Sequence, residues 1–413
     1  MLSRLSEMKR ILDAIHDPQI RIVHIYGARG SWKTHILNLL MHDHSISQKK
    51  FFLSFEQDIV AKQFLTVHDV MTSISLTTGI DWSKPSILFI NEVQYSKNLI
   101  ALISEIINMP EIQTCFVLTG ITSISDHEDK RISDIMIHPL SFFDYLESKN
   151  IHTTYLHIDS YSPIMMQEIV HYRDEYMTRW GYPSVVSAST AEQKIHELKA
   201  IIHKIYDKDI AFWFNRDEML VFETVMNDIC QQSWSSYKHI PTAKRLWITS
   251  RLMMKYKNFL HEQYLIDTVP YFCHDKKSEL SHQETLYMTD NGLISYMGKN
   301  FWSKLHDMTS IKTFIYNEII KHIDHKDTIQ SYQKINMSSI DFLIIHDDGT
   351  ITPIIVSERN SPAIPKIYHS FAEKYGDKVR RYVKTTLSSY SKGKHADRDY
   401  LCIPHALIGD LIK

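Results

Sequence analysis

The chain has 413 residues, of which 44% are hydrophobic and 23% are charged, and this ordinary composition excludes disordered, collagen-like and coiled-coil rod proteins. Its formal net charge is −2, so no global basic field draws it to nucleic acid, and no apolar run reaches the about 18 residues of a membrane span. The four cysteines form no Cys-x-x-Cys pair, which favours a reducing, cytoplasmic environment over a disulfide framework: Cys115, Cys230, Cys273 and Cys402.

The amino-terminal part of the sequence alternates between strand and helix patterns. Residues 3–16 have the apolar spacing of an amphipathic helix. Four β-rich runs follow at residues 21–26, 50–55, 86–90 and 114–118, and the third is continuously apolar, as in a buried parallel strand. A glycine-containing turn and a helical segment separate the first two runs. This alternation predicts a doubly wound α/β domain.

The pattern changes after Pro139. Residues 142–230 are mostly helical, and residues 216–290 hold three helical stretches followed by short strands, which suits a winged helix. A helix at 311–323 and strands at 328–333, 340–346 and 352–357 predict a second α/β domain. We therefore expect three parts: an α/β core at 1–150, a helical and winged-helix-like region at 151–300, and an α/β domain at 301–413.

One segment has the pattern of a phosphate-binding loop, G-x-x-x-x-G-K-[ST], between a strand and a helix: Gly27-Ala28-Arg29-Gly30-Ser31-Trp32-Lys33-Thr34. In such a loop backbone N–H groups hold the phosphates, the lysine reaches the β and γ oxygens, and the hydroxyl holds Mg²⁺. Trp32 replaces the second glycine, at a point where a Cβ crowds the phosphates. The alternative interpretation is a strand–turn–helix corner with a chance Lys-Thr pair.

A second polar motif, Asn91-Glu92, follows the apolar run that ends at Ile90. Asp-Glu after four apolar residues is the Walker B arrangement, in which the aspartate holds the Mg²⁺ shell and the glutamate polarises the attacking water. Asn91 keeps the shape of the aspartate but loses its charge. We therefore expect weakened Mg²⁺ affinity, with Glu92 retained.

Together these segments resemble the bacterial and archaeal AAA-superfamily P-loop ATPases that carry a carboxy-terminal nuclease-like domain of unknown function. Residues 118–120 (LTG) match the family's sensor segment, and residues 138–142 (HPLSF), 181–183 (GYP) and 286–293 (LYMTDNGL) match further motifs. The resemblance implies ATP and Mg²⁺ as cofactors, with these nucleotide-binding residues: Gly27, Arg29, Gly30, Ser31, Lys33, Thr34, Asn91 and Thr119. It implies catalytic roles for Glu92 and for Arg131, an arginine eight residues before Pro139 that would contact a γ-phosphate as a sensor or finger; the alternative is a solvated loop arginine.

The family's last domain resembles PD-(D/E)xK nucleases, in which an acidic helix residue, an aspartate and a Glu-x-Lys pair converge on a metal. Glu318 and Asp341 match the first two and are the candidate metal ligands. The Glu-x-Lys positions hold Ile355 and Ser357, and strand alternation turns Glu358 to the other face. We therefore expect no nuclease activity and a docking or dimerising surface in its place.

The winged-helix-like region carries a basic stretch with interleaved aromatic residues: Lys238, Lys244, Arg245, Arg251, Lys255 and Lys257 with Tyr237, Trp247 and Tyr256. This composition suits phosphate contacts with DNA. The alternative is a solvated helix face above a buried aromatic stripe.

The fold expected from these observations is multidomain α/β: a P-loop ATPase parallel sheet, a helical and winged-helix middle, and a carboxy-terminal restriction-endonuclease-like α/β domain. The expected function is that of an AAA-type ATP-binding protein with weak or lost hydrolysis, acting as a nucleotide-responsive or structural module. The alternative is a nucleotide-independent DNA- or protein-binding scaffold with a vestigial P-loop. Expected partners are nucleotide, DNA through the winged-helix-like region, and a protein or a second copy of the chain, without a membrane.

Overall fold

The computed structural model describes residues 5–55, 64–96, 98–124, 129–151, 153, 162–179, 181–233, 237–272, 284–297, 308–333 and 339–412. The chain divides into two compact units. The amino-terminal unit comprises Ser3–Pro139 with Glu262–Tyr264, and the carboxy-terminal unit comprises Leu140–His261 and Leu265–Lys413. The division falls where the sequence pattern changes, and the expected parts 151–300 and 301–413 both belong almost entirely to the carboxy-terminal unit. The three-part division remains a prediction.

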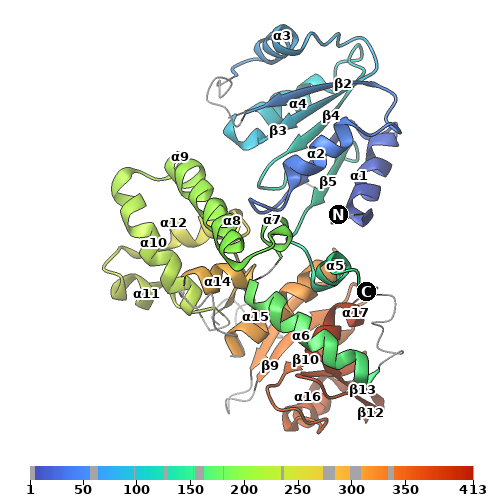
Figure 1. Cartoon of the computed structure of the whole chain (residues 1–413), viewed down its shortest axis with the longest axis vertical. Coiled ribbons are helices and arrows are strands. Elements are labelled where there is room, and N and C mark those ends of the chain that lie inside the picture. The colour runs from blue at the N-terminus through green and yellow to red at the C-terminus, as the bar shows by residue number, and fades with distance from the viewer. Residues whose placement is uncertain are drawn as a thin grey trace. The chain divides into compact units, whose positions relative to one another are not determined.

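A parallel sheet lies at the centre of the amino-terminal unit (Figure 1), with the strand order β2-β3-β4-β1-β5. The four predicted strands are confirmed, and the sheet gains a fifth, β5, whose mixed polar and apolar residues at the sheet edge gave no apolar run. The elements are α1 Leu5–His16, β1 Ile22–Tyr26, α2 Lys33–Met41, β2 Lys49–Ser54, α3 Val67–Thr78, β3 Ser86–Asn91, α4 Leu99–Ile106, β4 Thr114–Thr119 and β5 Ile132–Met136.

This sheet is covered by helices on both faces, because successive strand residues point to opposite sides. Phe89 of β3 packs in the core that includes Leu37 of α2. Its neighbour Leu88 packs in the core that includes Ile74 of α3 and Ile103 of α4. Strand β3 is buried along its whole length, as its continuous apolar run predicts, and the doubly wound α/β core is confirmed.

Helices make up the first part of the carboxy-terminal unit, followed by a two-stranded antiparallel sheet of β6 and β7. The helices are α5 Phe142–Ser148, α6 Pro163–Arg179, α7 Pro183–Ser187, α8 Ala191–Lys204, α9 Ala211–Trp213, α10 Arg216–Gln231, α11 His239–Arg245 and α12 Ser250–Glu262, and then come β6 Ile266–Val269, β7 Thr285–Met288 and α14 Asn291–Met297. Three helices followed by an antiparallel strand pair fit the expected winged helix, which remains a prediction.

The rest of the carboxy-terminal unit is built on a mixed six-stranded sheet of order β12-β13-β11-β10-β9-β8. Strands β8, β9 and β10 pair antiparallel, whereas β10, β11 and β13 run parallel. The elements are α15 Met308–His322, β8 Thr328–Gln333, β9 Ser339–Ile345, β10 Ile351–Val356, α16 Lys366–Tyr375, β11 Arg381–Thr386, β12 Ser391–His395, β13 Arg398–Pro404 and α17 Ile408–Ile412. The predicted helix and three strands are confirmed to within three residues at each end.

Two further features of the described chain bear on the sequence predictions. None of its described helices combines the length and apolar character needed to cross a lipid bilayer. Cys115, Cys230 and Cys402 are free thiols, whereas Cys273 lies outside the described residues. Burial raises the pKa of Cys115 to about 12, so this thiol stays protonated and unreactive at neutral pH.

Candidate functional site

The glycine-containing loop joins β1 to α2 at the carboxyl ends of the parallel strands, the edge where open α/β sheets bind ligands. Gly27 and Gly30 have φ angles of 135° and 83°, which side-chain-bearing residues rarely adopt. A Cβ at Gly27 would lie 2.3 Å from the carbonyl oxygen of Ile137. Glycine is therefore required at this position by both conformation and space.

Trp32 occupies the left-handed position at the end of the loop, with a φ of 69°. For a bulky residue this conformation costs about 1–3 kcal/mol. The indole ring packs against His35, with the ring centroids 4.7 Å apart. Trp32 is also the N-cap residue of α2 and makes no side-chain capping bond. The amino end of α2 is therefore left without a side-chain cap, which suits an anionic ligand.

Lys33 is buried, with 4% of its surface exposed, and its ammonium group closes the loop on itself. Nζ donates to the carbonyl oxygens of Gly27 and Ala28, each at 2.8 Å. The neighbouring Ser31 hydroxyl is fully buried and finds no hydrogen-bond partner among the described residues. A buried cation and an orphaned hydroxyl beside an uncapped helix end fit a phosphate group.

Asn91 joins the strand ends of the sheet. Its Oδ1 accepts hydrogen bonds from the hydroxyls of Thr34 at 3.0 Å and Thr119 at 2.8 Å, and its Nδ2 donates to the Ser54 hydroxyl at 3.3 Å. The structure thus brings together three residues that the sequence predicted for the site, and adds Ser54 from β2. An aspartate at position 91 would place a negative charge between the two threonine hydroxyls, whereas the amide accepts the same bonds without charge.

Glu92 and Arg29, both buried with 7% exposure, face each other across the site. The Arg29 Nη2 atom lies 3.5 Å from Oε2 of Glu92 and donates to the Tyr95 hydroxyl at 2.5 Å. Gln94 donates to the same Glu92 oxygen at 2.5 Å, and the Glu92 backbone N–H donates to Thr119 at 3.0 Å. The carboxylate predicted to polarise water is therefore already held by a cation and an amide. Gln94 and Tyr95 were not predicted, because their contacts depend on the turn after β3.

The prediction for Arg131 is wrong for a nucleotide held by the same chain. Its carbonyl oxygen accepts from the N–H groups of Arg21 at 2.8 Å and Ile22 at 3.1 Å, which places it at the amino ends of β1 and β5, opposite the loop. Its guanidinium pairs with Asp129 at 2.7 Å and donates to Asn108 at 2.8 Å. The pairing lowers the pKa of Asp129 to about 2. Arg131 could act as an arginine finger only on a nucleotide that is bound by a second copy of the chain.

The two candidate metal ligands of the carboxy-terminal unit lie in separate contacts. Asp341 pairs with Lys312 at 2.6 Å and accepts from the Val356 N–H at 2.8 Å. That bond continues the β9–β10 ladder just past its last backbone pair, Phe342 with Ile354. Within the described ranges no group of three or more His, Cys, Asp or Glu side chains is arranged to hold a metal ion.

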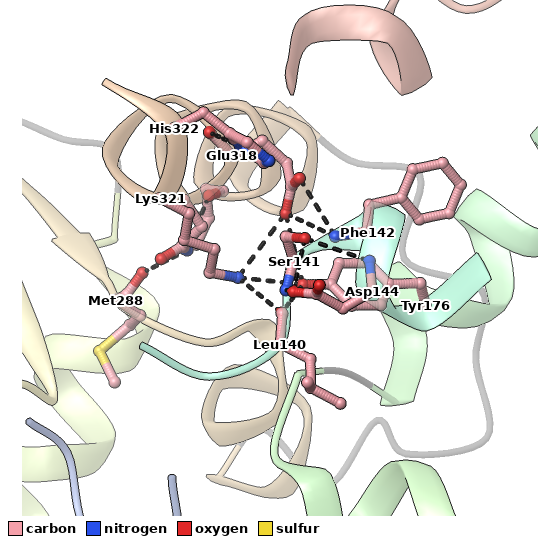
Figure 2. A network of polar contacts seen from close by, with 11 residues as sticks. Leu140, Ser141, Phe142, Asp144, Tyr176, Met288, Glu318, Lys321 and His322 are labelled. Atoms are coloured by element: carbon pink, nitrogen blue, oxygen red, sulfur yellow. Dashed lines mark hydrogen bonds and ion pairs between the residues drawn. The ribbon is translucent and has the colours of Figure 1, made fainter. Parts of the chain in front are cut away.

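Glu318 instead faces the first turn of α5 (Figure 2). Its carboxylate accepts from the Phe142 N–H at 3.0 and 3.1 Å, lies 3.6 Å from the Lys321 ammonium, and accepts from the Tyr176 hydroxyl at 3.4 Å. Lys321 donates to the Leu140 carbonyl and to Tyr176, each at 3.0 Å. We call these five residues the anchor network. The negative charge of Glu318 stabilises the amino end of α5. The expectation that Glu318 and Asp341 bind one metal ion together is therefore corrected, because the two carboxylates make separate contacts within the protein.

The other motifs noted in the sequence of the carboxy-terminal unit, residues 181–183 and 286–293, also make contacts near the anchor network. The Leu140 N–H donates to the Gly181 carbonyl at 2.7 Å, and the Asn317 side chain donates to the Met288 carbonyl at 3.0 Å. Asp290 accepts from the Gly292 N–H at 2.8 Å. Burial raises the pKa of Asp290 to about 7, although nearby Lys321 opposes the shift. In the carboxy-terminal unit these motifs therefore hold helices and turns together.

Two family models match separate parts of the chain. Residues 19–146 match the model of a family described as AAA domain. Residues 171–308 match the model of a domain of unknown function, DUF8612. None of the curated proteins matches the sequence.

Solved structures give distant similarities. The replication initiator DnaA bound to AMPPCP and single-stranded DNA is 14% identical, with a TM-score of 0.30, and the match covers 63% of this chain and 88% of DnaA. For Cdc6p from Pyrobaculum aerophilum the identity is 10%, the TM-score 0.29 and the coverage 73% and 94%. For Drosophila ORC bound to DNA the corresponding values are 9%, 0.28, 71% and 93%. The family match, together with the parallel sheet, identifies residues 19–146 as an AAA-type, ATPase-like α/β domain.

Proposed function

We propose that the AAA-type domain binds ATP or ADP and hydrolyses ATP weakly or not at all, so that the chain acts as a nucleotide-responsive or structural module. The observation that supports this proposal is the uncapped amino end of α2 beside buried Lys33 and the orphaned Ser31 hydroxyl. Backbone N–H groups at a helix start and a lysine together form a phosphate site.

The charges of the site favour a phosphate. Lys33 and Arg29 contribute two positive charges and Glu92 one negative charge, which leaves a local net charge of +1. Bound phosphate would draw the Lys33 ammonium away from the two loop carbonyls that it now contacts. Thr34 and Asn91 would hold Mg²⁺, which neutralises phosphate charge when bound, but Asn91 contributes no charge of its own to the ion. We therefore expect nucleotide affinity to depend little on Mg²⁺.

Nucleotide binding is tested by thermal unfolding of the full chain with ATP and with ADP, with Mg²⁺ or with EDTA. A ligand at about 100 times its Kd stabilises the folded state by about 2.7 kcal/mol, so the Tm should rise for both nucleotides. Lys33→Ala is the matched control and should lose the rise. If the wild-type chain and Trp32→Gly both show no nucleotide-dependent change in Tm, the binding proposal fails.

Hydrolysis should be far slower than the ordinary enzyme range of about 1 s⁻¹ or more. Glu92 is held by Arg29 and Gln94, and Asn91 lacks the charge that positions a metal ion. Phosphate release from ATP measures the turnover, with Glu92→Gln as the control for contaminating activity. A rate of about 1 s⁻¹ or more that disappears in Glu92→Gln would show an intact catalytic site.

A second candidate function is a nucleotide-independent DNA- or protein-binding scaffold with a vestigial P-loop. It is favoured by the hydrogen bonds that Lys33 makes to its own loop, because these bonds engage the ammonium group within the protein. The thermal-unfolding measurement with ATP and ADP also separates the two functions. A scaffold would show no nucleotide-dependent Tm in any variant and would keep its partner binding in Lys33→Ala.

For the nuclease-like carboxy-terminal domain we propose a docking or dimerising role without cleavage. Asp341 is engaged by Lys312 and by the Val356 N–H, which supports a role in holding the ends of β9 and β10. Plasmid and single-stranded DNA and RNA incubated with the protein and Mg²⁺ or Mn²⁺ should remain intact. Cleavage that disappears in Asp341→Ala would overturn this proposal.

A further inference from the structure

Helices α11 and α12, as far as His261, form a segment of the carboxy-terminal unit whose charged residues are all basic. Residues 238–261 contain six Lys or Arg and no Asp or Glu, in a chain whose net charge is −2. The two helices are consecutive and are joined by residues 246–249, a short turn of the length found between the helices of a helix-turn-helix.

Three of the six cations are neutralised by carboxylates from other parts of the unit. Arg245 pairs with Asp228 at 2.6 Å, Lys255 with Glu218 at 2.7 Å, and Lys257 with Glu284 at 2.5 Å. The pairing with Lys255 lowers the pKa of Glu218. These three cations therefore add little net field outside the molecule.

The other three cations are exposed, and none has an ion pair within the described part of the chain: Lys238, Lys244 and Arg251. Lys244 lies near the end of α11 and Arg251 in the first turn of α12, so the two lie on either side of the turn. The exposed face around this turn therefore carries uncompensated positive charge.

Trp247 lies in that turn between Lys244 and Arg251. It is 94% exposed and has a φ of 57°, a strained conformation for a bulky residue. Its side chain therefore contributes little to the folded core. Both the exposure of the indole and the strained backbone make tryptophan an unfavourable residue at this position. Two apolar side chains of the same helices, Ile240 and Met254, are also 49% and 45% exposed. The turn thus presents apolar surface flanked by free cations.

Helix α12 packs firmly along one side and exposes the other. Met253, Tyr256 and Phe259 are buried in the core that includes α10, and the hydroxyl of Tyr256 donates to the Glu218 carbonyl at 2.6 Å. The opposite side carries Arg251, Met254, Lys255 and Asn258. An exposed, rigidly supported helix of this kind fits the major groove of B-form DNA.

We propose that the face formed by Lys244, Trp247 and Arg251, with the exposed side of α12, binds double-stranded DNA. Helix α12 enters the major groove, while Lys244 and Arg251 contact phosphates on its flanks and Trp247 packs against the sugar-phosphate backbone. Duplex RNA is a poorer partner, because its major groove is too deep and narrow to admit a helix. The surface belongs to the carboxy-terminal unit, so this binding does not depend on nucleotide.

Fluorescence anisotropy of a labelled DNA duplex two helical turns long, titrated with the full chain without nucleotide at several salt concentrations, tests the proposal. Each neutralised phosphate contributes about 0.9 to the slope of log K against log salt. The double variant Lys244→Glu/Arg251→Glu should lower the slope by about two and the affinity by at least about tenfold. Trp247→Ala should weaken binding without changing the slope, because it removes contact area and no charge.

The matched control is Lys199→Glu/Lys204→Glu on α8, which removes two exposed lysines from another helix of the same unit. It should bind the duplex as the wild type does, and because the titration contains no nucleotide, failure of nucleotide binding leaves this test intact. Equal loss in the α8 control would show nonspecific charge attraction and overturn the proposal. Tighter binding of duplex RNA or single-stranded DNA, or no duplex binding by the wild type, would also overturn it.

Discussion

The P-loop site and the anchor network contain the same kinds of residue but differ in what their polar groups contact. Around α2, the Ser31 hydroxyl is buried and has no partner among the described residues, and none of their side chains caps the helix. In the anchor network, the Glu318 carboxylate caps α5 and the Lys321 ammonium has three protein oxygens around it. The first arrangement leaves hydrogen-bonding capacity for a ligand, and the second uses it within the protein.

This difference shows why a motif alone does not assign chemistry. From the sequence, Lys33 was predicted to bind phosphate and Glu318 to bind a metal ion. A buried ion pair with full hydrogen bonding stabilises a particular arrangement of helices, whereas an uncapped helix start with a nearby cation favours a bound anion. The contacts of the neighbouring groups, and not the residue type, separate the two roles.

The largest effect is expected when the anchor network is broken. Lys321→Met leaves Glu318 buried without its cation, and removing one partner of a buried pair costs about 3–5 kcal/mol. Urea unfolding of the full chain, followed by a signal from the carboxy-terminal unit, measures the loss. The double variant Glu318→Leu/Lys321→Met should recover part of it, because no unpaired charge remains. If Lys321→Met is as stable as the wild type, Lys321 does not stabilise the buried Glu318 carboxylate.

A pH series on Asp290 sharpens the same comparison. Burial raises the pKa of Asp290 to about 7, above the about 3.9 of an unfolded chain. Between about pH 4 and 7 the unfolded state releases this proton while the folded state keeps it, so the stability contributed by Asp290 falls as pH rises. Asp290→Asn removes this pH dependence. Across that window the free energy of unfolding of the variant should rise, relative to that of the wild type, by up to roughly 3 kcal/mol. A constant difference between the two unfolding curves would contradict the protonated state of Asp290.

A smaller effect is expected at the P-loop. Trp32→Gly removes the indole and the strained left-handed side chain, and should tighten ATP binding by about tenfold, or 1.4 kcal/mol. Trp32→Ala separates the two causes, because it removes the ring but keeps a Cβ at a φ of 69°. Equilibrium competition with a fluorescent ATP analogue measures both variants. Weaker binding in Trp32→Gly would mean that the indole itself contacts the nucleotide.

The smallest effect is expected for Arg131→Ala. The Arg131 side chain pairs with Asp129 at the amino ends of the strands, so nucleotide affinity should stay within about twofold of the wild type. The same competition measurement applies, at a protein concentration where the chain is monomeric. A tenfold loss in the monomer would place Arg131 in the site and refute its assignment to the opposite edge.

The parts of the fold that the sequence predicts are those with strong periodicity. β1, β3 and β4 are recognisable because each is a largely buried run rich in apolar residues, whereas β2, KKFFLS, is recognisable from its short apolar centre although only Phe51 and Leu53 are buried. β5 was missed because its sequence, ISDIM, is not a continuous apolar run, and at the edge of the sheet only Ile135 of its five residues is buried. In the carboxy-terminal unit the strands β11 to β13 were likewise not assigned.

The site was predictable where strand order alone determines proximity. Asn91 and Thr119 are the last residues of the neighbouring parallel strands β3 and β4, and Thr34 lies in the first turn of the helix after β1, so their meeting follows from the sheet topology. Arg131 was misplaced because the strand β5 lies between it and Pro139, and five residues at about 3.3 Å each carry the chain to the other edge of the sheet. The pairing of Glu318 with the Phe142 N–H, 176 residues away in sequence, leaves no local signal.

Isothermal titration of ATP into the wild-type chain and into Lys33→Ala tests the central claim most directly, namely that the P-loop site is open to a ligand. We predict saturable heat from one site per chain in the wild type, in the presence of EDTA as well as Mg²⁺, and its loss in Lys33→Ala. No heat from the wild type, or equal heat from both proteins, would contradict it.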